Sequence, residues 1–148
     1  MSLINRIQDE IKQAMRAQDK ARLGALRLIT AAIKQREVDE RIVLSDDQIM
    51  VLMDKMLKQR RESIALYEKA ARQELIDQEQ FEIRVIQSFL PTPLTADEID
   101  ALVKKAILDT SASSIKDMAA VMALVKPQIQ GRADAGMVSA RIKAQLTG

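Results

Sequence analysis

Apolar residues recur at three- and four-residue spacing along almost the whole chain, which is the period of helices that bury one face. The first two series are Ile4, Ile7, Ile11 and Met15, and then Leu23, Leu26, Ile29 and Ile33. Asp19 stands where a residue would cap the second of these helices. Because no stretch alternates long enough to indicate a strand, the sequence predicts an all-α fold of about seven helices.

Two capping boxes mark the starts of later helices. Ser45 with Gln48, and Thr95 with Glu98, have the spacing at which each side chain bonds the backbone amide of the other residue. The first box opens a long helix, which we expect to reach the neighbourhood of Ala71.

The segment FLPTPL, residues 89–94, divides the chain. Pro91 and Pro93 lack a backbone N–H and disfavour helical geometry in the residue before each of them. The sequence therefore predicts an N-terminal helical subdomain over residues 1–91, with about four helices, one of them long. A small three-helix tail subdomain is expected over residues 94–148.

The last helix of the tail is rich in small residues. The helix before it is expected to end before Pro127, and the last helix is expected to bury Ala135, Val138, Ile142 and Leu146. Its opposite face would leave the backbone approachable, either by another helix or by a sugar-phosphate chain. Candidate contacts for such a chain are Gly131, Arg132, Gly136, Ser139 and Lys143. Close helix packing is the alternative.

Two charged clusters stand out in the N-terminal part. In KQRRES, Lys58 and Arg61 share a face, while Arg60 falls nearer the apolar line. Arg60 is expected to be partly buried against an acidic partner on a neighbouring helix. The alternative is that Lys58, Arg60 and Arg61 form a second basic patch, besides the candidate contacts near the last helix, and bind phosphate. The carboxylates around one turn of the fourth helix are expected to form a solvated face; they are Glu74, Asp77, Glu79 and Glu82.

Composition excludes several kinds of chemistry. The chain has no His and no Cys, which excludes a Ser-His-Asp triad, a thiol nucleophile and a structural zinc site. Its four glycines form no phosphate-binding loop, and no metal or organic cofactor is indicated. A net charge of +2 confines any affinity for nucleic acid to local patches. No apolar stretch approaches bilayer length, so a cytoplasmic protein without a membrane partner is expected.

Three motifs carry a resemblance to a known family: QRRES at residues 59–63, FLP at 89–91 and GRAD at 131–134. With them the chain resembles, over essentially its whole length, the YqeY family of small proteins with a GatB/YqeY domain. The C-terminal part of that family is similar to the tail domain of the GatB subunit of the tRNA-dependent amidotransferase. The resemblance implies tRNA as a partner, with amidotransferase subunits or an aminoacyl-tRNA synthetase as further partners.

The tail motif of the family matches this chain at Gly131, Arg132, Asp134 and Val138. The chain departs from the family at two places. Ala71 stands where the family commonly has a glycine, and residues 117–120 read Asp-Met-Ala-Ala where the family often has Asp-Met-Gly-Lys. The second departure removes one candidate phosphate contact.

We expect a non-catalytic, tRNA-associated helical module linked to tRNA-dependent amidation. It would bind backbone and shape, because three aromatic residues offer too few platforms for base stacking. The family is also labelled with carbon-nitrogen ligase activity that uses glutamine as amide donor. This chain has no activated nucleophile for that reaction. The alternatives are a protein-binding adaptor and an accessory component of an amidotransferase complex.

Overall fold

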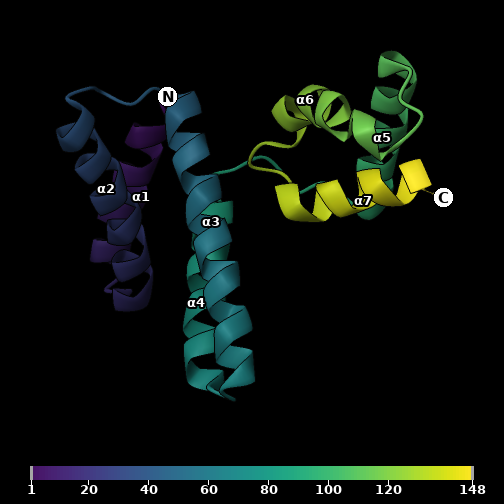
Figure 1. The fold of residues 1–148 in the computed structure, drawn as a ribbon. Coiled ribbons are helices and arrows are strands. Elements are labelled where there is room, and N and C mark those ends of the chain that lie inside the picture. Colours follow the sequence, from purple (N-terminus) through teal and green to yellow (C-terminus); the bar gives the residue numbers. More distant parts are fainter. Residues whose placement is uncertain (1, 148) are drawn as a thin grey trace. The chain divides into compact units, whose positions relative to one another are not determined.

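The structure of the chain, a computed structural model, describes residues 2–147. Within that range the chain forms seven α-helices, one short 3-10 helix and no strand (Figure 1), which confirms the all-α prediction. The chain divides into two compact units, Met1–Pro91 and Thr92–Gly148. Each unit encloses an apolar core of its own. None of the helices in the described range has an apolar stretch long enough to cross a membrane.

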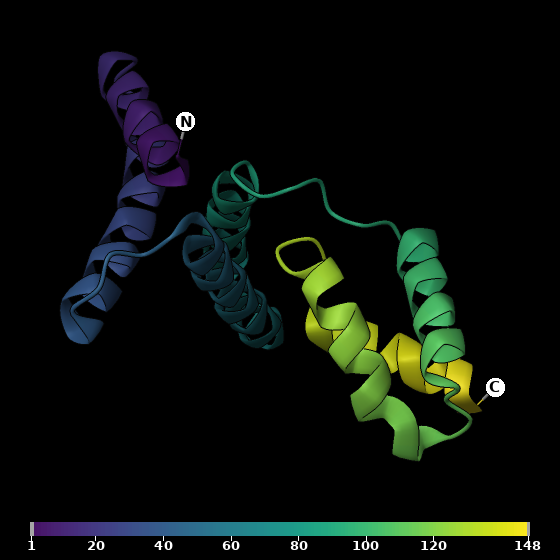
Figure 2. The same cartoon turned by 90° about the horizontal axis from the view of Figure 1, so that it is seen from above.

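The N-terminal unit is built from four helices. Their bounds are α1 Leu3–Arg16, α2 Lys20–Glu40, α3 Asp46–Lys69 and α4 Gln73–Gln87. Helix α1 packs against α2, and α3 runs alongside α4 (Figures 1 and 2). The centre of the core consists of Ile7, Leu26, Ile29, Ile49, Met53 and Ile86. Every helix of the unit therefore contributes a face that the apolar periodicity predicts.

The C-terminal unit contains three α-helices and the 3-10 helix. Their bounds are α5 Ala96–Thr110, the 3-10 helix Ile115–Asp117, α6 Met118–Ile129 and α7 Ala135–Thr147. The three α-helices pack against one another (Figure 2). Their fully buried side chains are Ile99, Val103, Val121, Val125, Val138 and Ile142. β-Branched residues, valine and isoleucine, thus fill most of this core.

The three predicted N-terminal caps are confirmed. Asp19 accepts a hydrogen bond from the backbone N–H of Arg22 at 3.1 Å. Both capping boxes are complete, with hydrogen bonds of 2.9 and 3.2 Å in the first and 3.1 Å in each direction in the second. Because a cap depends on residues three positions apart, the sequence alone carries this information.

Two residues expected in the cores are exposed. Met15, in the last turn of α1, is 47% exposed, and Ala14 is buried instead. Ala135 is exposed at the first position of α7. A periodic pattern extends through the terminal turns of a helix whether or not a neighbouring helix reaches that far, which is why periodicity overestimates the core at helix ends.

The expected end of the sixth helix before Pro127 is wrong. Helix α6 continues through Pro127 to Ile129. A proline this close to the C-terminus costs one backbone hydrogen bond at the end of the ladder. Burial of Val125 and Ile129 on either side holds the last turn in place. The helix ends two residues later, where Gly131 has φ of 73°.

The end of α3 shows why glycine is common in the family at the position of Ala71. Ala71 has φ of 54°, in the left-handed region that glycine favours. The N–H of Ala71 donates to the carbonyl of Glu68 at 3.2 Å, and that of Arg72 donates to the carbonyl of Tyr67 at 3.0 Å. These are the two bonds of a Schellman ending, a motif that usually places glycine at this position.

Replacing Ala71 by glycine is therefore expected to stabilise the chain. The substitution removes the steric cost of a Cβ in the left-handed region, which gives a gain of about 0.5–1 kcal/mol. Urea unfolding followed by circular dichroism measures it. Ala70→Gly is the matched control, because Ala70 has φ of −90° and gains nothing from glycine. A gain that is equal for both variants would contradict the explanation.

Candidate nucleic-acid interface

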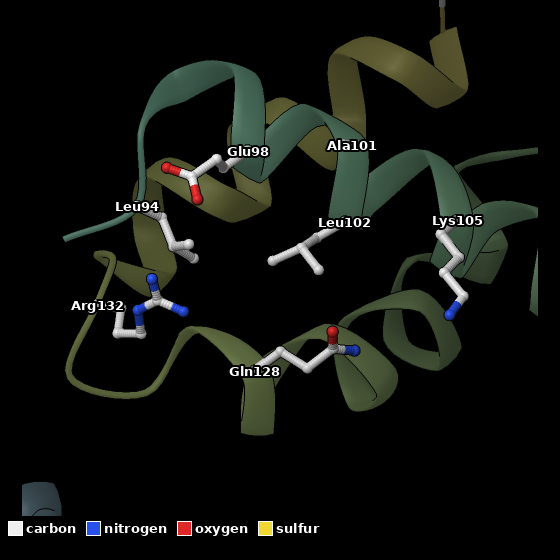
Figure 3. Close-up of a pocket in the computed structure, with 7 residues that line it drawn as sticks. All are labelled: Leu94, Glu98, Ala101, Leu102, Lys105, Gln128 and Arg132. Atoms are coloured by element: carbon white, nitrogen blue, oxygen red, sulfur yellow. The ribbon is translucent and has the colours of Figure 1, made fainter. Parts of the chain in front are cut away.

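An open groove of about 630 Å³ lies between α5 and the end of α6 in the C-terminal unit. Leu94 and Leu102 point into it, and Arg132 and Lys105 stand at its two ends (Figure 3). Cations separated by an apolar stretch suit a nucleic-acid backbone, in which phosphates alternate with less polar sugars. The groove is thus a candidate contact for a nucleic-acid backbone.

Arg132 has a structural role at one end of this groove. Its Nε donates to the carbonyl of Thr92 at 2.9 Å, and its own carbonyl accepts from the N–H of Leu94 at 2.8 Å. These bonds hold residues 92–94 against the turn between α6 and α7. The two terminal nitrogens of the guanidinium make no hydrogen bond to any residue that the structure describes. Arg132 can therefore hold the turn and contact an anion at once.

Glu98 lies beside Arg132 in the groove (Figure 3). Hydrogen bonds from the backbone and side chain of Thr95 lower the pKa of this carboxyl, and the positive charge of Arg132 lowers it further. The carboxylate is therefore ionised at neutral pH and offsets part of the charge of Arg132. Among the described residues that line the groove, Glu98 is the one carboxylate.

The two glycines among the predicted contacts have local structural explanations. Gly131 is buried and has φ of 73° within the turn that follows α6. Gly136 is exposed in the first turn of α7, where a Cβ would lie 3.2 Å from Oδ2 of Asp134. That carboxylate accepts a hydrogen bond from the N–H of Met137 at 3.2 Å. Asp134 thus occupies an amide that would otherwise be free to bind phosphate.

The remaining predicted contacts on α7 differ in exposure. Ser139 is half-buried, whereas Lys143 is exposed and does not line the groove of Arg132 and Lys105. Gly136 and Lys143 are seven residues apart, so they share one exposed face of α7. The structure therefore distributes the predicted contacts between this face and the groove.

In the C-terminal unit, most carboxylates have a hydrogen-bond or ionic partner, whereas most cations form no ion pair among the described residues. Residues 92–148 contain seven Lys or Arg and six Asp or Glu. Four of the acids have partners within the unit: Glu98, Asp117 and Asp134 accept from backbone amides, and Asp100 pairs with Arg141 at 2.7 Å. Within the described range, Arg141 is the one cation of this unit in an ion pair. The other six cations form no ion pair in the described part of the unit; five of them, all lysines, are exposed, and the sixth is the half-buried Arg132 next to Glu98.

The second basic patch does not act as one surface. Arg60 is half-buried and donates from Nε to Glu82 of α4 at 3.1 Å and from Nη1 to the carbonyl of Met56 at 3.3 Å. This confirms the expected acidic partner on a neighbouring helix. Lys58 is exposed and Arg61 is half-buried. Two cations of the three are thus left for any external contact.

The expected solvated face on α4 is wrong at Glu82. Its side chain is 11% exposed, and it also accepts from Gln78 at 2.9 Å. Burial raises the pKa of the neighbouring Glu79, with a further contribution from the charge of Glu82. Glu74, by contrast, is exposed, and a hydrogen bond from Arg72 lowers its pKa. The cluster is therefore partly an internal ion-pair site.

Two features of the C-terminal unit escape prediction from the sequence. Lys105 follows Lys104 on an ordinary amphipathic helix, and nothing in that pattern places it opposite Arg132. Arg141 contacts both carboxylate oxygens of Asp100, at 2.7 and 2.8 Å, across a separation of 41 residues. Both pairings arise from the packing of helices that are distant in the sequence.

A family model described as Yqey-like protein matches residues 4–146. The chain belongs to the YqeY family. Its relatives include proteins named "Altered inheritance of mitochondria protein 41, mitochondrial". The one from Pyrenophora tritici-repentis is 32% identical over 145 residues, which cover 95% of this chain and 79% of the relative. The one from Lachancea thermotolerans is 29% identical, with the same two shares, and the one from Kluyveromyces lactis is 29% identical over 72% of this chain and 60% of the relative.

These names contradict the expectation of a cytoplasmic protein. Each of the three relatives is named as mitochondrial. The expectation rests on the lack of an apolar stretch of bilayer length, and that property does not distinguish one aqueous compartment from another.

Proposed function

We propose that this YqeY-family chain is a non-catalytic module that binds the backbone of tRNA through its C-terminal unit. The observation that carries the proposal is the uneven partnering of charge in that unit. Its carboxylates are largely taken up by helix caps and by Arg141, while Lys105, Lys143 and Arg132 keep donors for phosphate. Net charge understates such a surface, because phosphates respond to nearby unpaired cations.

The proposal of a non-catalytic role rests on the side chains that the chain offers. It has no His and no Cys. The most buried carboxylate, Glu82, is held by Arg60 and Gln78. A general base must come within hydrogen-bond reach of a substrate, and this carboxylate is buried against Arg60 and Gln78. A link to tRNA-dependent amidation, through amidotransferase subunits or an aminoacyl-tRNA synthetase, is part of the proposal and rests on the resemblance to the GatB tail.

Binding of the full chain to deacylated total tRNA tests the proposal. We expect affinity, measured by fluorescence anisotropy, to fall steeply between about 50 and 200 mM salt, because bound phosphates release counterions. The variant Lys105→Glu/Lys143→Glu should bind more weakly, with a salt slope reduced by about two, since each lysine contributes one phosphate contact. Arg132 is left unchanged because it holds the segment at Thr92.

The matched control is Lys12→Glu/Lys69→Glu. Both of these lysines are exposed in the N-terminal unit, and the change in net charge is the same. The control should keep most of the affinity and the salt slope. An equal loss of tRNA affinity in both variants would indicate a response to net charge alone. A full chain that does not bind tRNA at about 50 mM salt would contradict the proposal.

A further inference from the structure

Helix α2 carries apolar residues on two opposite faces. One face is buried in the core and consists of Ala25, Leu26, Ile29 and Ile33. The other face is exposed, and there Leu28 is 45% and Val38 is 64% exposed. A helix on the surface of a folded unit usually turns a polar face to water. The outer face of α2 therefore leaves apolar area uncovered that a partner would bury.

The same helix has a strongly one-sided charge. Residues 20–36 contain five Lys or Arg and no Asp or Glu. Arg22 is paired with Glu10, and Arg36 with Glu40. Lys20, Arg27 and Lys34 are exposed and form no ion pair in the part of the chain that the structure describes. They repeat every seven residues, a rise of about 10 Å along the helix.

The apolar and charged positions together have the spacing of a two-helix interface. Ala21, Gly24, Leu28, Ala31 and Val38 follow alternating three- and four-residue steps, interrupted at Gln35. Lys20, Arg27 and Lys34 each precede a position of that seam by one residue. In paired helices this flanking position faces the charged residues of the partner and selects opposite charge.

We propose that the outer face of α2, from Lys20 to Val38, binds an acidic amphipathic helix of a partner protein. Acidic side chains at seven-residue spacing on that helix would meet Lys20, Arg27 and Lys34, and its apolar stripe would cover Leu28 and Val38. A second copy of this chain is a poor partner, because α2 has no carboxylate before Glu37 to set against these cations. A nucleic-acid backbone would leave the exposed apolar side chains without a partner.

The test uses the full chain and two synthetic helical peptides of three heptads. Both peptides have leucine in the seam; one has glutamate and the other lysine at the flanking positions. We expect the glutamate peptide to bind at least about tenfold more tightly in fluorescence anisotropy at 100 mM salt, because complementary charge selects the partner. Amide hydrogen exchange should show new protection over α2.

Two variants locate the site. Lys20→Glu/Lys34→Glu should reverse the preference between the peptides, whereas Lys12→Glu/Lys69→Glu, with the same change in net charge, should not. Leu28→Ser should weaken binding of the glutamate peptide by about fivefold, since the seam loses its most central large side chain. Equal effects of the two charge variants, or protection that appears outside α2, would overturn the proposal.

Other kinds of ligand are separate outcomes of the same design. If Lys20→Glu/Lys34→Glu abolishes binding of tRNA, or of vesicles containing phosphatidylserine, while the peptides bind equally, the proposal of an acidic helix is wrong. The tRNA proposal depends on Lys105 and Lys143 and is measured with different variants. Each proposal can therefore fail without the other.

Discussion

Replacing Ile142 by alanine is expected to destabilise the C-terminal unit strongly and to leave the stability of the N-terminal unit unchanged. Ile142 is fully buried in α7 and packs in a core separate from that of residues 1–91. Truncating a buried isoleucine to alanine costs about 2–5 kcal/mol. A unit as small as residues 92–148 has a total stability of about 3–9 kcal/mol, so the loss is a large part of it.

Hydrogen exchange measured by mass spectrometry resolves the two units in the intact chain. Peptides from α5, α6 and α7 should lose protection in Ile142→Ala, and peptides from α3 should keep it. Met137→Ala is the matched control on the same helix, because Met137 is 46% exposed and its removal leaves little cavity. Simultaneous loss in both units would show that they unfold as one cooperative body.

Removing the carboxylate of Glu82 is expected to destabilise the N-terminal unit by about 3 kcal/mol or more. The side chains of Arg60 and Glu82 are 13% and 11% exposed, so Glu82→Ala leaves a guanidinium largely out of water without its ionic partner. Replacing both residues, as Arg60→Met/Glu82→Leu, should recover most of the loss because it removes both buried charges. Urea unfolding of the single and double variants measures these differences.

The exposed ion pair of Arg72 and Glu74 supplies the comparison. These side chains are 57% and 63% exposed. Glu74→Ala is expected to change stability by no more than about 0.5 kcal/mol, since exposed charges are already well solvated. A similar loss for Glu74→Ala and Glu82→Ala would mean that burial does not set the strength of the inner pair.

The proposed tRNA surface and the outer face of α2 assign the two units different partners. In the C-terminal unit, the cations lie beside a groove and on the open face of α7. In the N-terminal unit, they border exposed apolar side chains of one helix. If both proposals hold, the YqeY-family chain joins a nucleic acid to a protein.

Local features of this protein could be predicted from the sequence. Helix starts at Asp19, Ser45 and Thr95 depend on side chains that bond backbone amides three residues away. The buried faces of the helices follow from a period of 3.6 residues, and they set the all-α class. The partial burial of the Arg60 side chain could also be predicted, because its position on the apolar side of α3 depends on the spacing within one helix.

Conformations held by distant packing could not be predicted in this way. Pro127 lies inside α6 because Val125 and Ile129 are buried against other helices, and that burial outweighs one lost hydrogen bond. The left-handed Ala71 is a similar case, since the turn between α3 and α4 requires a conformation that its own residue does not favour.

The sequence by itself determined the helices, their caps and the family of this protein, because these depend on residues close together in the chain or on motifs within it. Only the tertiary structure decided which charges are free. It set Glu82 against Arg60 and Asp100 against Arg141, and it brought Lys105 to the groove of Arg132. Charges on different helices become partners only when the cores bring those helices together, and local spacing does not record that arrangement.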